Sequence, residues 1–189
     1  MKYKLTDETM TTESGVLLHR IECVKSFGNV RAGDVGGWIE KEENLSQCDD
    51  CWVCGNARVY GNALVYGNAR VCGNALVCGN ALVCGDARVC GDAEVCGDAE
   101  VCGNALVSGN ARVCGDAVIG NINDYIVFKN NWSSGRYFTW TRSNDKWKVG
   151  CFYGTGKELI EKAYKDSKLS GDCYKVYVEL IEKLKELQK

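Results

Sequence analysis

Residues 52–117 form one uninterrupted run of eleven hexads, WVCGNA RVYGNA LVYGNA RVCGNA LVCGNA LVCGDA RVCGDA EVCGDA EVCGNA LVSGNA RVCGDA. Val, Gly and Ala recur at fixed positions, and the residue after each Gly is Asn or Asp. A period this strict is typical of a solenoid, in which each repeat buries its apolar face only against neighbouring repeats. We therefore predict a solenoid over this stretch.

The hexad itself indicates how the chain turns. In an extended Ala-x-Val-x segment, alternation sends Ala57 and Val59 to one face and Arg58 and Tyr60 to the other. The Gly-Asn or Gly-Asp pair that follows tolerates the positive φ of a sharp corner, and its recurrence every six residues excludes a helix. Three hexads per coil give a triangular coil of 18 residues.

This coil arranges the cysteines that follow each Val in outward-facing ladders with the strand spacing of about 4.8 Å. The ladders are Cys54, Cys72 and Cys90; Cys78, Cys96 and Cys114; and Cys84 and Cys102. Because their Cβ vectors are parallel and do not face one another, we expect free thiols in reducing buffer, packed as small hydrophobes, with no required disulfide. The alternatives are a redox role and a metal role for these thiols.

A pair of CxxC spacings, at Cys48, Cys51 and Cys54, raises the alternative of a zinc site. The repeat register places Cys51 inward and the other two outward on different sides. The three sulfurs then do not converge, and we predict neither a metal site nor a cofactor.

The charge distribution divides the chain into three parts. The net charge is −4 over residues 1–51, −2 over 52–117 and +4 over 118–189. We predict an N-terminal cap over 1–44, with a strand at 16–24 and a Gly-rich turn region, because a solenoid end exposes unpaired backbone. The β-helix then occupies 45–123, and an α+β module follows over 124–189.

Two stretches resemble a known family. The segment HRIECVKSFGNVRAGDVGGWIEKEENLSQ, followed by WVCGNARVYGNA, resembles hexapeptide-repeat proteins of bacterial prophages and phages. The stretch WKVGCFYGTGKELIEKAY is similar to the same phage-type family. The resemblance implies a mainly β protein whose solenoid is a left-handed parallel β-helix.

In the C-terminal module, we expect a strand at 125–128, a hairpin of 136–142 with 146–152, a helix at 157–165, and a second helix with Ser170 as its N-cap. Basic and aromatic residues alternate there, a composition that suits nucleotides or single-stranded nucleic acid. The alternative is a sheet with its aromatic residues turned inward on the helices and its Lys and Arg in solvent. The candidate binding residues are Lys129, Trp132, Arg136, Tyr137, Trp140, Arg142, Lys146, Trp147 and Lys148.

One side of the coil is the most apolar, with Leu64, Tyr66, Leu82 and Val118 facing outward. An exposed apolar patch of this kind marks an interface, and we predict a homo-oligomer, either a dimer or a trimer. The alternative is that the chain's own C-terminal segment covers this side.

The resemblance also raises catalysis, since many hexapeptide-repeat proteins are acyltransferases that use a histidine of the coil as general base. The one histidine of this chain, His19, lies in the cap, and no hexad is interrupted by a loop. We therefore predict that this protein is not an enzyme.

The function predicted is that of a non-catalytic phage or prophage protein, an inhibitor or scaffold that recognises a host protein or nucleoprotein complex such as a defence-system component. The alternatives are a sponge for a small signalling nucleotide and a relative of the acyltransferases. With no apolar run near 18 residues and no signal-peptide core, we expect the host cytosol and no membrane partner.

Overall fold

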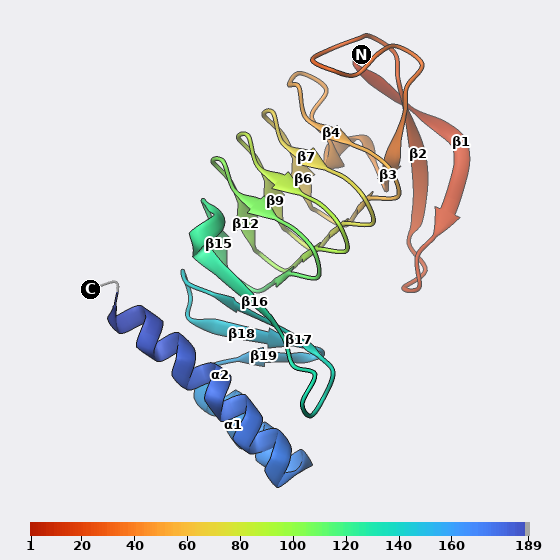
Figure 1. Cartoon of the computed structure of the whole chain (residues 1–189). Helices are drawn as coiled ribbons and strands as arrows, with labels where there is room; N and C mark the ends of the chain where they lie inside the picture. Colours follow the sequence, from red (N-terminus) through yellow and green to blue (C-terminus); the bar gives the residue numbers. More distant parts are fainter. Residues whose placement is uncertain (188–189) are drawn as a thin grey trace. The chain divides into compact units, whose positions relative to one another are not determined.

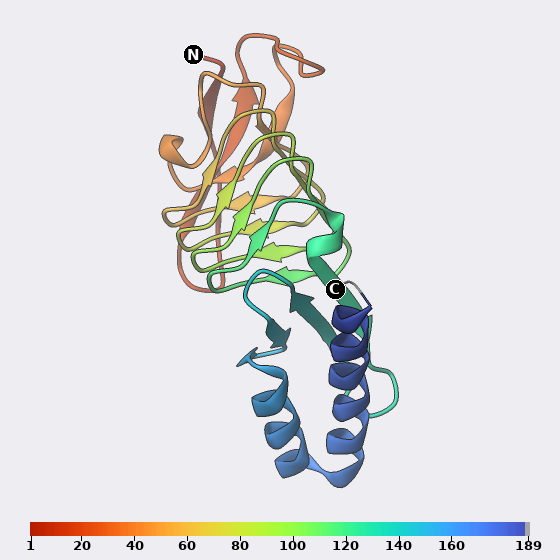
Figure 2. The same cartoon turned by 90° about the vertical axis from the view of Figure 1, so that its left-hand side faces the viewer.

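The computed structural model describes residues 1–187 (Figures 1 and 2). The chain forms two compact units, Met1–Asp124 and a second that begins at Tyr125. The first is a parallel β-solenoid with strands added at its N-terminal end, and the second joins an antiparallel sheet to two helices. The protein is therefore mainly β, as the hexads predict.

Each hexad of the solenoid contributes one two-residue strand. The strands are β4 (Trp52–Val53), β5 (Arg58–Val59), β6 (Leu64–Val65), β7 (Arg70–Val71), β8 (Leu76–Val77), β9 (Leu82–Val83), β10 (Arg88–Val89), β11 (Glu94–Val95), β12 (Glu100–Val101), β13 (Leu106–Val107), β14 (Arg112–Val113) and β15 (Val118–Ile119).

These strands stack in three parallel sheets, and each strand pairs with the strand three hexads away. Figure 2 shows the resulting succession of coils. Backbone hydrogen bonds continue this register through the corners, for example from the Cys54 N–H to the Val71 carbonyl at 2.9 Å and from the Asn56 N–H to the Gly73 carbonyl at 2.8 Å. The period of 18 residues per coil is thus confirmed.

The solenoid core consists of the Ala and Val of successive hexads. Ala87 and Val89 are completely buried, whereas Arg88 is exposed, so the inward register predicted from alternation is confirmed. The corner glycines have positive φ; that of Gly79 is +74°, and a Cβ there would lie 2.9 Å from the backbone nitrogen of Gly97. Close stacking of the corners therefore requires Gly at this position.

The N-terminal region contains β1 (Tyr3–Thr11), β2 (Leu17–Cys23), β3 (Val35–Ile39) and the short 3-10 helix η1 (Glu42–Asn44). The first three strands are antiparallel, and β3 then pairs in parallel with β5. Parallel pairing thus begins before the first hexad, since Leu45 also bridges Val65. These contacts cover the backbone edge of the first coil.

The stretch between this region and the first hexad is held by the buried ammonium of Lys2. It donates to the carbonyl of Asp49 at 2.6 Å and to the carbonyl of Cys51 at 2.9 Å. Cys51 is completely buried, Cys48 is exposed and Cys54 is half-buried. The sulfurs therefore lie in different environments, as the repeat register predicts.

The first unit ends with the 3-10 helix η2 (Ile122–Asp124). The second contains β16 (Tyr125–Lys129), β17 (Tyr137–Thr141), β18 (Lys146–Val149), β19 (Phe152–Gly154), α1 (Gly156–Asp166) and α2 (Lys168–Glu186), with its four strands antiparallel in chain order.

The two helices share a core with one face of this sheet. Phe138 and Trp147 from the strands and Tyr174 and Ile181 from α2 are all buried in it. The N-cap of α2 is Ser167, whose side chain accepts from the Ser170 N–H; Ser170 itself lies inside the helix, which corrects the prediction. The helix therefore begins at Lys168, ahead of Ser170.

Within residues 1–187, no helix combines the length and the apolar character needed to cross a membrane.

Candidate functional site

The most exposed aromatic side chain of the second unit is Trp132, at 80%. It lies in residues 130–136, the loop that joins β16 to β17. We call Lys129, Trp132, Arg136 and Tyr137 the Trp132 surface, because they comprise two loop residues and the strand residues at the two ends of the loop. Lys129 and Tyr137 are directly paired in the β16–β17 register.

The loop is held by Asn130, which is completely buried. Its side-chain amide donates to Ser133 Oγ at 2.8 Å, and its Oδ1 accepts from the Trp132 N–H at 3.1 Å. Its backbone N–H donates to the Arg136 carbonyl at 3.0 Å. Sequence reasoning missed Asn130; the signal for it was the turn-forming run of Asn, Ser and Gly around Trp132.

The Trp132 surface is basic and aromatic. The Lys129 ammonium lies 4.0 Å from the centroid of the Tyr137 ring, a cation–π contact. Lys129, Arg136 and Tyr137 are all exposed, the last at 40%. Four of the nine predicted binding residues are therefore gathered at one end of the sheet.

Trp140 and Trp147 do not belong to an accessible patch, which corrects the prediction for these two residues. They are 4% and 1% exposed, and they pair across β17 and β18 on the face that packs against the helices. The Trp140 indole N–H donates to Asp145 Oδ1 at 2.8 Å. Alternation along the strands turned these large rings into the core.

The remaining basic candidates lie elsewhere. Arg142 follows the end of β17, and Lys146 opens β18, at the opposite end of these strands from Tyr137. A strand of five residues spans about 15 Å, so these two residues are separate from the Trp132 surface. Lys148 is half-buried and pairs in register with Thr139 and Tyr153.

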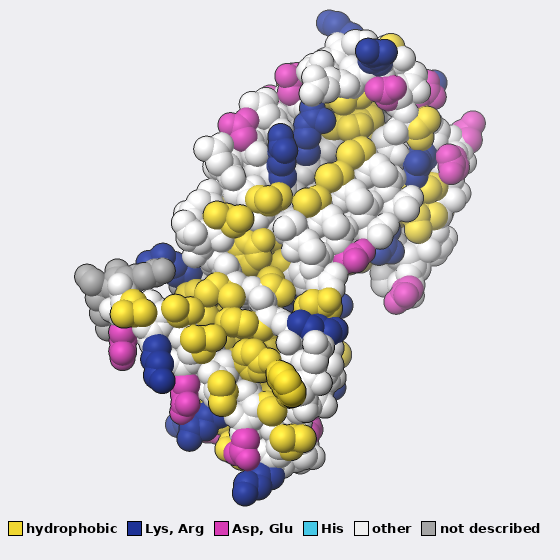
Figure 3. Space-filling model, viewed as in Figure 1, with side chains coloured by type: hydrophobic (Ala, Val, Ile, Leu, Met, Phe, Trp, Pro, Cys, Tyr) yellow, Lys and Arg dark blue, Asp and Glu magenta, His cyan; other side chains and the backbone are white. Residues whose placement is uncertain are grey.

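The apolar side of the solenoid carries the predicted interface residues. Leu64 and Leu82 pair in register on β6 and β9 and are half-buried, and Val118 is 43% exposed. A hydrogen bond with Cys84, together with burial, raises the pKa of Tyr66 to about 12. Figure 3 shows hydrophobic side chains gathered along the solenoid coils, with Lys and Arg side chains beside them.

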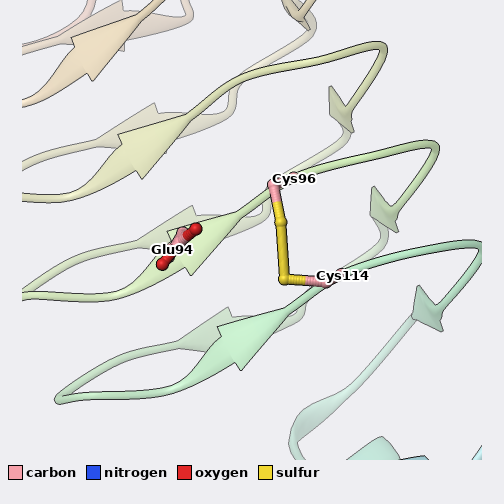
Figure 4. Close-up of side chains that lie close together, drawn as sticks. All are labelled: Glu94, Cys96 and Cys114. Atoms are coloured by element: carbon pink, nitrogen blue, oxygen red, sulfur yellow. A yellow bond between two sulfur atoms is a disulfide. The ribbon is translucent and has the colours of Figure 1, made fainter. Parts of the chain in front are cut away.

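One pair of ladder cysteines is joined, which corrects the expectation that cysteines of a ladder do not face one another. Cys96 and Cys114 form a disulfide between adjacent coils, with their Cα atoms 4.7 Å apart (Figure 4). Rotation about the Cα–Cβ bond of each cysteine brings the two sulfurs together, even though the two Cα–Cβ bonds are parallel. Glu94 lies beside them, and its carboxylate is 3.2 Å from Arg112 Nε.

His19 lies in β2 and is half-buried. One nitrogen of its ring, Nδ1, is 3.3 Å from the Thr6 carbonyl oxygen. This contact holds the ring against β1, within the strands that cover the first coil.

Comparison with known proteins agrees with this architecture. The repeat described as the YdcK beta solenoid repeat matches residues 53–67, 57–73, 69–85 and 99–115. A protein of Escherichia coli (strain K12) named "Uncharacterized acetyltransferase YdcK" is 37% identical over 59 residues, which are 28% of this chain and 18% of that protein. The chain thus matches less than a fifth of that relative's length. The matched repeats and the stacked coils together identify this chain as a repeat β-solenoid protein.

Proposed function

We propose that this protein is a non-catalytic binding protein of phage or prophage type, in which the solenoid is a rigid scaffold and the Trp132 surface contacts a macromolecule. The observation that carries the proposal is an 80% exposed Trp on a loop held by a buried Asn. Exposing an indole forgoes the stabilisation that burial of a large apolar side chain provides.

The composition of the Trp132 surface suits recognition. Trp, Tyr and Arg are enriched among the residues that dominate binding energy at protein interfaces. Because Asn130 already fixes the loop, a partner that covers Trp132 orders little additional backbone. Lys129 and Arg136 add positive charge, which favours a partner with an acidic surface.

The phage or prophage origin is supported by the resemblance of residues 19–47 and the hexads that follow. On this proposal the protein acts in the host cytosol, and its partner is a host protein or nucleoprotein complex, such as a component of a defence system that the protein inhibits by occupying its surface. The apolar side at Leu64 and Leu82 supports a homo-oligomer that presents more than one Trp132 surface.

The proposal is tested by capture from host lysate with three tagged forms, the wild type, Trp132→Ala and Leu169→Ala. Leu169 is 60% exposed on α2 and serves as a matched control for loss of an exposed apolar side chain. We expect one host component to be retained by the wild type and by Leu169→Ala and lost by Trp132→Ala. Equal recovery of the host component by all three forms would show that the Trp132 surface does not bind it.

A second candidate function is binding of a small signalling nucleotide, supported by the contact between Lys129 and Tyr137, which places a cation beside an aromatic ring. Bound nucleotide would add a base absorption to the ultraviolet spectrum of the purified protein and would be released by denaturation. A wild-type spectrum explained by its aromatic residues alone, together with no thermal shift on adding nucleotides, argues against this candidate.

A third candidate is acetyl transfer, supported by the printed name of the E. coli relative. The solenoid of this chain contains no histidine, so a coil imidazole is not available as general base. Steady hydrolysis or transfer from acetyl-CoA by the purified protein would overturn the non-catalytic proposal.

A further inference from the structure

Three free thiols form a continuous ladder along one side of the solenoid. Cys54, Cys72 and Cys90 directly follow β4, β7 and β10, which pair in parallel. The Cys54 N–H donates to the Val71 carbonyl and the Cys72 N–H to the Val89 carbonyl, each at 2.9 Å, so the register continues through the cysteines. All three side chains are half-buried and therefore accessible from solvent.

The spacing of this ladder is set by the coil. Cys96 and Cys114 occupy equivalent positions one coil apart on another side, and their Cα atoms are 4.7 Å apart. Side chains at equivalent positions of parallel strands leave the backbone in the same direction. Rotation about the Cα–Cβ bonds then sets the distance between two neighbouring sulfurs, and at Cys96 and Cys114 it brings them into contact. The repeat thus brings neighbouring thiols within reach of one metal ion.

We propose that neighbouring thiols of the Cys54–Cys72–Cys90 ladder bind Cu(I) as a linear two-coordinate complex. Thiolates are soft ligands that select Cu(I) over harder cations. Binding converts Cu⁺ and two cysteine thiols into a bis-thiolate complex with one negative charge and releases two protons to water, with no change in the oxidation state of copper or sulfur. Cys72 is a ligand in both possible pairs.

The ladder does not provide the four ligands of a structural zinc site. Among residues 1–187, the group of three Cys, Asp, Glu or His side chains whose donor atoms lie within 4.8 Å of one another is Glu94, Cys96 and Cys114. That group is already engaged by the disulfide and by Arg112. The ladder therefore offers its sulfurs in pairs, which matches the coordination number of Cu(I) and not that of Zn²⁺.

Two arginines lie on the same strands as the ladder. Arg70 and Arg88 are two residues before Cys72 and Cys90, on the same outward side. Their charges favour the anionic bis-thiolate. They also line a surface pocket of about 260 Å³ with Asp50 and Asp86, so their charge is shared with these carboxylates.

The experiment is an anaerobic titration with Cu(I), using ascorbate as the reductant and bicinchoninate as the competing chelator. Cysteine alkylation is then mapped residue by residue by mass spectrometry. We expect Cu(I) to protect Cys72 fully and Cys54 and Cys90 in part, and Cys72→Ser to abolish this protection and weaken binding at least tenfold. Cys151→Ser, which removes an exposed thiol outside the solenoid, is the matched control and should bind as the wild type does.

Should Cys72→Ser fail to fold by circular dichroism, the double variant Cys54→Ser/Cys90→Ser provides the second test, because it leaves Cys72 without a neighbouring thiol in this ladder. Equal alkylation of Cys72 and Cys151 in the presence of Cu(I) would overturn the proposal. Equal protection by Zn²⁺ at the same free concentration would overturn the two-coordinate assignment.

The pH dependence of binding gives an independent readout. Because binding displaces the thiol protons, the apparent association constant should rise as the pH is raised from 6 to 8. A constant affinity over this range would contradict binding by thiols.

Discussion

Asp145 and Lys185, 40 residues apart in the chain, form an ion pair that joins the β17–β18 hairpin to α2, with Asp145 Oδ2 2.8 Å from Lys185 Nζ. The other carboxylate oxygen of Asp145 accepts from the indole of Trp140, also at 2.8 Å. Asp145 has a φ of +52°, a left-handed conformation that Asp and Asn tolerate better than most residues. One side chain thus links the turn, the sheet and the helix.

This ion pair predicts a dependence of stability on pH. Burial by itself would raise the pKa of Asp145, but hydrogen bonds from Lys185 and Trp140 outweigh it, and the pKa is lowered. A carboxylate with a lowered folded-state pKa stabilises the fold above its unfolded pKa of about 3.9, and this contribution is lost as pH falls through the folded value. The substitution Asp145→Asn removes the charge and keeps an acceptor for Trp140.

We therefore expect Asp145→Asn to melt below the wild type at pH 7, and the difference in Tm to shrink as pH falls below about 4. Thermal unfolding followed by tryptophan fluorescence at pH 7, 5, 4 and 3 measures this difference. Effects of acid on the rest of the chain are common to both proteins and cancel. A difference that stays constant down to pH 3 would show that the charge of Asp145 contributes nothing.

The solenoid core predicts that the same substitution at two neighbouring residues has very different effects on stability. Val89 is completely buried between Val71 and Val107, whereas Arg88 is exposed. Val89→Asp buries an unpaired charge at a cost of several kcal/mol and should abolish cooperative unfolding of the solenoid. Arg88→Asp, the control, should retain the wild-type circular dichroism and melt within a few degrees of it. Two variants that melt alike would contradict the inward register.

Corner glycines provide a test of stacking between coils. Gly79 and Gly109 both have positive φ, but a Cβ at Gly79 would lie 2.9 Å from the Gly97 nitrogen, whereas nothing lies within 4 Å at Gly109. Both Ala substitutions place a Cβ on a residue with a left-handed backbone conformation, which costs about 1–2 kcal/mol. We expect Gly79→Ala to lower the free energy of unfolding further, by at least another 1 kcal/mol, since backbone of the next coil must move. Equal losses in denaturant titrations would contradict this explanation.

The disulfide predicts a stability that depends on redox conditions. Cys96 and Cys114 close a loop with a sequence separation of 18, and a disulfide across a loop of this size stabilises by about 3 kcal/mol. Cys114→Ser should lose about this amount when the two proteins are compared without reductant, and the loss should largely disappear in excess dithiothreitol. If both thiols of the wild type are alkylated without prior reduction, the disulfide is absent in solution and no difference is expected.

The apolar side of the solenoid predicts self-association. Leu64 and Leu82 are directly paired on adjacent coils, and a partner subunit that covers them would gain roughly 1.5–3 kcal/mol for each side chain fully buried. We expect the wild type to be an oligomer by light scattering and Leu64→Lys/Leu82→Lys to have a lower mass. Leu76→Lys, on another side of the coil, is the control. A monomeric wild type would contradict the prediction. A double mutant of unchanged mass would show that the interface does not include Leu64 and Leu82.

The solenoid could be predicted from sequence in detail because its contacts repeat. Ala87 and Val89 meet equivalent residues 18 positions away, so the period that appears in the sequence is also the period of the packing. The need for Gly at a corner such as Gly79 follows from the same stacking. The C-terminal strands and helices were also recognisable from local patterns, although the segment 146–152 proved to contain a turn between β18 and β19, and the N-cap of α2 proved to be Ser167.

The sequence by itself therefore determined the coil, with Ala and Val facing inward and the cysteine ladders facing outward. Only the tertiary structure decided which aromatic residues are accessible. Trp132, Trp140 and Trp147 are equally prominent in the sequence, but the helices pack on one face of the sheet and bury the last two, whereas Asn130 holds Trp132 in an exposed loop. Likewise, the parallel Cα–Cβ bonds of a cysteine ladder do not determine where the sulfurs lie. The side-chain rotation that joins Cys96 to Cys114 depends on the neighbours that each side chain meets in the folded protein.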